Sequence, residues 1–185
     1  MGNCVVKYGP TVYTTEADAL DFIAKHTIIP SPSLLGHYEH AGKLYIFMSR
    51  MPGVLLDEGI RQMTPEQPQT ISGELKLITD QLRHLRISDF EDEWYIGSLN
   101  RQPCRDLIFS PNPKRSKGPF SSGLELYENM IVRWKDYVLD PPIPQSEIEF
   151  TRKLYREISG SELVFTHGDL VPHNILFRMV MSQEL

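Results

Sequence analysis

Three short apolar runs near the N-terminus have the length and residue types of β-strands. They are separated by polar or glycine-containing segments, which is the pattern of strands joined by turns and helices. The runs lie at residues 5–8, 34–38 and 44–48. His40-Ala41-Gly42-Lys43 falls between the last two and predicts the turn of a β-hairpin.

Four longer stretches repeat their apolar residues at helical spacing. The first opens at Thr14–Asp18 with Thr15 as N-cap and is stopped by Pro30. The second starts at Thr64-Pro65-Glu66-Gln67, where Gln67 completes a capping box. The third follows Gly118–Ser122, and Ser146 with Glu149 caps the fourth. The apolar faces predicted for the last two helices are Leu124, Tyr127, Ile131 and Trp134, then Leu154, Tyr155 and Ile158.

A polar loop near the C-terminus carries the strongest candidate chemistry. Two further short strands are predicted at 163–166 and 175–177, and the residues between them include Asp169 and Asn174. An aspartate with an asparagine five residues later suits phosphoryl transfer, because the carboxylate can accept the proton of an attacking hydroxyl while the amide oxygen helps to hold magnesium. The alternative is a strand–turn–strand in which Gly168-Asp169 only makes the turn.

The pattern His167-Gly168-Asp169-x-x-x-x-Asn174 resembles the catalytic loop of the aminoglycoside phosphotransferase family. That family is related to choline kinases and, more distantly, to protein kinases. The resemblance implies that Asp169 is the catalytic base and that Asn174 is a magnesium ligand. It also implies that His167 braces the loop through hydrogen bonds, and that His173 has no role in the chemistry.

Lys7 and Glu16 are candidate nucleotide-binding residues in the N-terminal strand and helix. Taken alone, Lys7 is a strand lysine that points at solvent, and Glu16 is an acid favoured by the helix dipole. The family resemblance implies that Lys7 holds the ATP phosphates and that Glu16 orients Lys7. Asp18 is the rival for the role of Glu16.

The segment Ser49-Arg50-Met51-Pro52-Gly53 ends the third strand and reverses the chain. In the family this segment is the linker between two lobes, and its backbone holds the adenine ring. The resemblance therefore points to Ser49 and Met51 as backbone contacts to the nucleotide, with Met48 behind the ring. His37 and His40 lack a third ligand for a metal site.

The architecture implied by the resemblance is α+β: a two-lobed, protein-kinase-like fold that is incomplete at both ends. Residues 1–51 would form a partial N-lobe, and residues 52–185 a partial, mostly helical C-lobe with the catalytic loop at 165–177. The segments 95–98 and 103–106 resemble fungal-type members and are expected to form a surface hairpin. The family pattern would add strands before Lys7 and a magnesium-binding aspartate after Phe177, so the chain is expected to be truncated.

The composition and net charge limit the possible binding partners and the cellular compartment of the protein. The net charge of −5 disfavours nucleic acid and anionic membranes, and no apolar run approaches the ~20 residues of a membrane span. A basic run at 114–117 is expected to be a solvated loop, with phosphate binding as the alternative. Cys4 and Cys104 are far apart and fit neither a disulfide framework nor a zinc site, so a cytoplasmic protein is expected.

Two functional hypotheses follow. The first is ATP-dependent and magnesium-dependent transfer of a phosphoryl group to a hydroxyl of a small molecule, whose identity the sequence does not give. The second is a non-catalytic remnant that binds a nucleotide or a protein, favoured by the absence of an aspartate after Asp169. Whether the chain is an active enzyme is left open between them.

Overall fold

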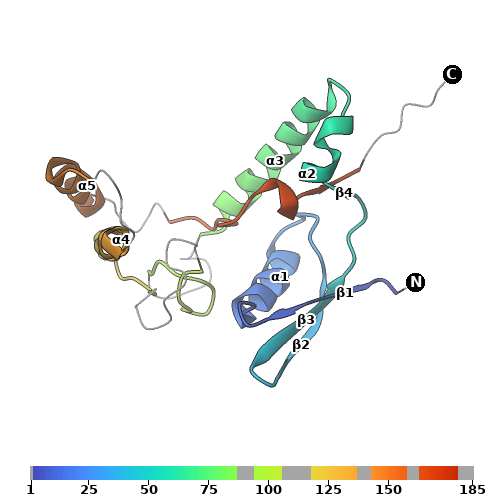
Figure 1. The fold of residues 1–185 in the computed structure, drawn as a ribbon, viewed down its shortest axis with the longest axis horizontal. Helices are drawn as coiled ribbons and strands as arrows, with labels where there is room; N and C mark the ends of the chain where they lie inside the picture. Colours follow the sequence, from blue (N-terminus) through green and yellow to red (C-terminus); the bar gives the residue numbers. More distant parts are fainter. Residues whose placement is uncertain (1, 87–93, 106–117, 137–142, 158–162, 179–185) are drawn as a thin grey trace. The chain divides into compact units, whose positions relative to one another are not determined.

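The computed structural model describes residues 2–86, 94–105, 118–136, 143–157 and 163–178, without the side chains of 133–136. Its helices and antiparallel strands confirm the predicted α+β class (Figure 1). The chain divides into two compact units, residues 1–84 with 169–185 and residues 85–168. The predicted lobes, 1–51 and 52–185, are a different division and stay a prediction.

The first unit contains a three-stranded antiparallel sheet with the strand order β1-β3-β2. Its strands are β1 (Cys4–Gly9), β2 (Leu34–His40) and β3 (Lys43–Ser49). Ala41 and Gly42 close the predicted β2–β3 hairpin with positive φ angles of 50° and 69°. Both central residues of a two-residue turn take such angles when the turn follows the right-handed twist of the strands. The predicted hairpin is therefore confirmed.

Helix α1 (Thr14–His26) packs on one face of this sheet and closes a small core. Leu44 and Ile46 alternate on β3, so both face α1 and meet Val12 and Ala17 there. The N-cap of α1 is Tyr13, so the predicted cap, Thr15, is wrong. Thr15 instead lies inside the first turn and is buried, because the core contacts of Val12 and Ala17 set where the helix begins.

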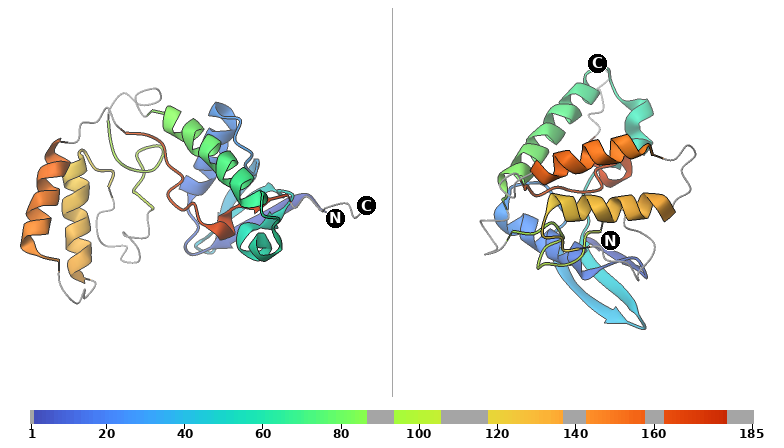
Figure 2. Two further views of the ribbon diagram at one scale, coloured as in Figure 1. Left: turned by 90° about the horizontal axis from the view of Figure 1, so that it is seen from above. Right: turned by 90° about the vertical axis from the view of Figure 1, so that its left-hand side faces the viewer.

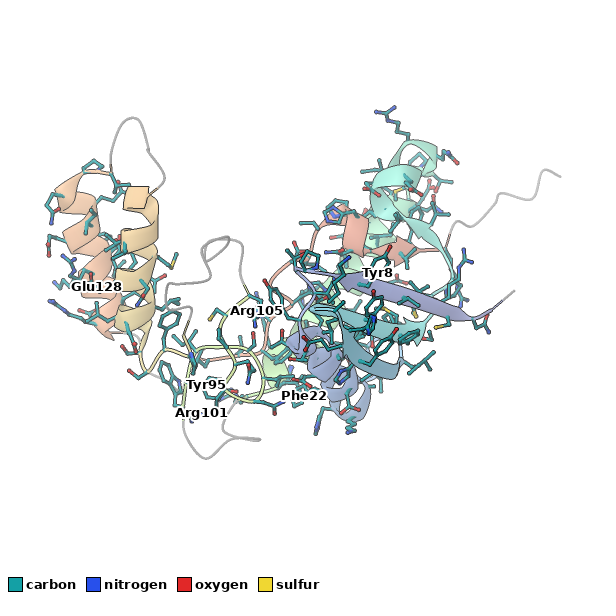
Figure 3. All side chains as sticks on the ribbon, turned by 60° about the horizontal axis from the view of Figure 1, so that its bottom comes forward. Tyr8, Phe22, Tyr95, Arg101, Arg105 and Glu128 are labelled. Carbon is teal, nitrogen blue, oxygen red and sulfur yellow. The ribbon has the colours of Figure 1, made fainter. Side chains whose placement is uncertain are left out.

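The opposite face of the sheet carries a row of stacked aromatic rings. Tyr38 stacks on Tyr45 with 5.0 Å between ring centroids, and Tyr45 stacks on Tyr8 at 5.4 Å. The register places these three residues side by side across the strands. Figure 3 shows Tyr8 on its strand. Such cross-strand pairs stabilise the sheet beyond its backbone hydrogen bonds.

The other described elements of the first unit are helices and one small strand pair. After the sheet come β4 (Val54–Leu55), α2 (Leu56–Gly59), the 3-10 helix η1 (Ile60–Gln62) and α3 (Gln67–His84). The Thr64 N–H donates to Gln67 Oε1 at 2.8 Å, which is the predicted capping contact of Gln67. The 3-10 helix η5 (Pro172–Asn174) and β5 (Leu176–Phe177) complete the unit, and β5 pairs antiparallel with β4.

The second unit contains two packed helices, α4 (Gly123–Asp136) and α5 (Gln145–Glu157) (Figure 2). Tyr127 stacks on Tyr155 with 4.8 Å between centroids. Arg152 bridges the helices, because its Nε and Nη2 donate to the two carboxylate oxygens of Glu128 at 2.5 and 3.0 Å. Figure 3 labels Glu128 beside the two helices. This hydrogen bonding raises the pKa of Arg152 above its usual range.

One predicted core position of α5 is wrong. Leu154 is 46% exposed, whereas Ile148 is buried and joins Tyr127 in the core. Ile148, Arg152 and Tyr155 share one face at helical spacing, and Leu154 lies on the other. The side chain of Trp134 and the whole of Ile158 lie outside the described residues.

The segment predicted as a surface hairpin is partly buried. Tyr95 and Phe120 are 4% and 0% exposed, and Ile96 exchanges two backbone hydrogen bonds of 2.8 Å with Phe120. Within residues 95–105, the Ser98–Gln102 bridge closes a turn of hairpin form. The basic run 114–117 lies outside the described residues. In the part of the chain that the structure describes, no helix has the length and apolar character needed to cross a membrane.

Candidate active site

The predicted catalytic loop is anchored by backbone pairing at its C-terminal end. Its N-terminal flank, predicted as a strand at 163–166, forms a single bridge between Val164 and Arg86. Its C-terminal flank, β5, pairs with β4 through Leu176 and Phe177. Pro172 begins η5, where its fixed φ and missing N–H cost nothing.

Asp169 and Asn174 are brought together within this loop. Asn174 Nδ2 donates to the Asp169 carboxylate Oδ2 at 2.9 Å and to the Asp169 carbonyl at 3.0 Å. The Asn174 N–H donates to the Val171 carbonyl at 2.9 Å, so the backbone folds back on itself here. Both side chains are exposed. The amide orients the carboxylate and keeps its own oxygen, Oδ1, for another partner.

The oxygen donors of this pair fit a magnesium ion. Magnesium prefers carboxylate, amide and phosphate oxygens, and proteins usually hold it through one or two side chains together with phosphates and water. The described residues contain no group of three or more His, Cys, Asp or Glu side chains that could hold a metal alone. A magnesium ion at Asn174 would therefore depend on phosphate oxygens for further ligands.

Lys7 and Glu16 form the second predicted pair. Lys7 Nζ donates to Glu16 Oε2 in an ion pair between β1 and α1. Lys7 lies opposite Ile46 in the register, which places it on the sheet face that α1 covers. The other carboxylate oxygen of Glu16 accepts the Tyr13 N–H at 3.4 Å. The structure therefore pairs Lys7 with Glu16, the preferred candidate over Asp18.

The predicted adenine-binding segment follows β3 directly. Met48 is half-buried and packs against the core beneath α1. The Ser49 N–H donates to the Ser33 carbonyl at 2.9 Å, so this N–H already has a partner within the protein. Met51 lies after the strand and is also half-buried. Their role in nucleotide binding stays a prediction.

All the residues predicted for the site belong to one unit, made of residues 1–84 and 169–185. His167 and His173 are exposed, and His173 lies in η5. The contact between β4 and β5, which fixes the end of the catalytic loop, was not predicted from the sequence. Two-residue strands have no periodicity to detect, and only the glycines at 53 and 59 hinted at a close approach of two segments.

An acid–amide pair on one loop and a lysine–glutamate pair between a strand and a helix are the parts of a kinase-like phosphotransferase site. A model of the phosphotransferase enzyme family, APH, matches residues 10–184. Because the match spans nearly the whole chain, the protein belongs to this family. Lys7 lies just before the matched residues. No curated protein and no solved structure matches the chain.

Proposed function

We propose that this protein binds ATP with magnesium and transfers the terminal phosphoryl group to a hydroxyl of a small molecule. The observation that carries the proposal is the hydrogen bond between Asn174 and Asp169, inside a loop that the family model covers. It holds a carboxylate in a fixed orientation on a short, backbone-anchored segment. Positioning and charge neutralisation are the main demands of phosphoryl transfer.

In this proposal Asp169 accepts the proton of the attacking hydroxyl. Asn174 orients Asp169 through Nδ2 and would hold magnesium through Oδ1. When bound, the ion neutralises charge on the phosphates. Lys7 contacts the phosphates, and Glu16 holds the ammonium group in place by the ion pair. The Ser49 carbonyl and the Met51 backbone read the adenine edge, with Met48 behind the ring.

The subgroup of the family, the cellular location and the acceptor are also proposals. The segments 95–98 and 103–106 and the turn Gly118-Pro119-Phe120 favour a fungal-type member related to choline kinases. The small number of cysteines, Cys4 and Cys104, favours a cytoplasmic location. The acceptor is a small hydroxyl compound of unknown identity.

The test is ATP-dependent phosphorylation of a panel of hydroxyl compounds that includes aminoglycosides and choline, followed as acceptor-dependent release of ADP. We expect Asp169→Asn to lower kcat by roughly 100- to 10,000-fold, the usual effect of losing a general base. Asp80→Asn is the matched control, because Asp80 is an aspartate of α3 in the same unit and pairs with Lys76 at 2.6 Å.

An active protein with equal losses in both aspartate variants would contradict the role of Asp169. ATP binding without transfer to any acceptor, in every variant, would favour the non-catalytic nucleotide-binding alternative.

A further inference from the structure

Phe177 closes the catalytic loop against the segment that follows the predicted linker. The residue is 8% exposed and pairs with Val54 across the β4–β5 ladder. Its aromatic ring lies directly over Gly59, at the end of α2. A Cβ built on Gly59 would meet ring atoms Cε1 and Cζ at 2.6 Å. Real Cβ atoms do not approach other atoms so closely, so the position of the Phe177 ring requires glycine at residue 59.

A second glycine brings the backbones together at the other end of the same contact. Gly53 has φ of +131°, a region that favours glycine. A Cβ there would lie 2.8 Å from the Phe177 carbonyl oxygen. Two glycines thus make room for one phenylalanine, Gly53 for its backbone and Gly59 for its ring.

Hydrogen bonds connect the Phe177 contact to the predicted catalytic pair, Asp169 and Asn174. The Leu56 N–H donates to the Ile175 carbonyl at 2.9 Å, and the Ile175 N–H donates to the Pro172 carbonyl at 3.2 Å. Asn174 lies between Pro172 and Ile175 in the sequence, and its side-chain amide donates to the Asp169 carboxylate. Helix α2 is therefore connected to the Asp169 carboxylate through a short series of hydrogen bonds. A shift of β5 would be transmitted to Asn174 through them.

We propose that Phe177, seated between Gly53 and Gly59, is a positioning residue that fixes the Asp169–Asn174 loop to the segment after the linker. This inference rests on the proposed phosphoryl transfer for its kinetic consequence. The seat sets the orientation of the carboxylate and amide without contacting a substrate. Its disturbance lowers kcat more than it raises the KM for ATP, because Lys7 and Ser49 are untouched and the shift reaches the nucleotide only through the magnesium ion proposed at Asn174.

The test places a methyl group under the ring. Gly59 has φ of −86° and ψ of −14°, so alanine fits its backbone, and the predicted harm of Gly59→Ala is steric. We expect kcat to fall on the order of 10- to 100-fold, as for small misplacements of catalytic groups. In Gly59→Ala/Phe177→Leu the shorter side chain makes room for the methyl group, and most of the activity returns. Gly73→Ala is the matched control, since a Cβ on this α3 glycine meets nothing within 4 Å.

Amide hydrogen exchange gives a readout that does not need activity. Gly59→Ala should speed exchange at the Leu56 and Asn174 amides, Gly73→Ala should leave them unchanged, and the double variant should restore protection. Kinetics and exchange in Gly59→Ala that match Gly73→Ala would overturn the inference. So would a loss of kcat that follows the loss of thermal stability and is not restored in the double variant.

The two proposals fail separately. If the wild type transfers no phosphate to any acceptor, the proposed function fails and the exchange pattern alone decides the coupling. Faster exchange at both amides in Gly59→Ala then supports it, and unchanged exchange at Asn174 rejects it.

Discussion

The Glu16 carboxylate makes two contacts, one with Lys7 and one with the Tyr13 N–H. Replacing Glu16 with glutamine removes the negative charge but keeps one side-chain oxygen as a hydrogen-bond acceptor. Oε2 pairs with Lys7, and Oε1 accepts the Tyr13 N–H at the start of α1. The glutamine amide oxygen can still accept from Tyr13. The ionic attraction for the Lys7 ammonium group is lost.

The structure sets the size of the effect on folding. The Lys7 side chain is 55% exposed and that of Glu16 is 33% exposed, so water screens the pair and its contribution lies at about 0.2–1 kcal/mol. We therefore expect Glu16→Gln to lower the free energy of unfolding by about 1 kcal/mol or less. ATP affinity should fall more, by about tenfold or ~1.4 kcal/mol, because Lys7 then has to be oriented by the ligand.

Two measurements separate these effects. Urea unfolding followed by circular dichroism gives the free energy of unfolding, and titration calorimetry with ATP and magnesium gives the affinity. Asp18→Asn is the control, since Asp18 is the rival acid on the same helix. Unchanged ATP affinity in Glu16→Gln, or a larger loss in Asp18→Asn, would refute the assignment of Glu16.

Three further predictions concern the folded units. Ile46→Ala should lower the free energy of unfolding by about 2–5 kcal/mol in urea unfolding, because Ile46 is 0% exposed and its truncation would leave a cavity in the core. Thr15→Val should leave stability unchanged or raise it by up to about 1 kcal/mol in the same assay, because the buried Thr15 hydroxyl has no hydrogen-bond partner among the described residues. Hydrogen bonds from the Ser121 N–H and hydroxyl lower the pKa of Glu125 below its usual 4.5. The stabilisation of the start of α4 is therefore complete above that pH and is lost as the pH falls through the lowered pKa. Acid unfolding should show a smaller pH dependence in Glu125→Gln, and an unchanged profile would contradict this contact.

The strands and helices with clear periodicity could be predicted from the sequence. The β2–β3 hairpin was predicted from two short apolar runs and a turn with Gly42, and the structure confirms the strands and the turn. The ion pair of Lys7 and Glu16 followed from the family pattern, because a resemblance carries spatial information that local propensity lacks.

The features that were predicted wrongly, or not predicted at all, have physical causes. Thr15 has a better capping side chain than Tyr13, but burial against the sheet decided where α1 begins. Helix α5 is apolar on two sides, with Phe150 and Leu154 exposed, so the sequence does not tell which side faces α4. The β4–β5 pair is a contact between segments more than a hundred residues apart in the sequence, and no local pattern announces it.

The proposed nucleotide site is tested most directly by calorimetric titration of the wild-type protein with ATP, with and without magnesium, beside Lys7→Ala and Lys25→Ala. Lys25 is the matched control, because it is an exposed lysine paired with Asp21 on α1. The proposed site predicts magnesium-dependent binding by the wild type and by Lys25→Ala, and markedly weaker binding by Lys7→Ala. Absence of binding by the wild type, or equal affinities in the two lysine variants, would contradict it.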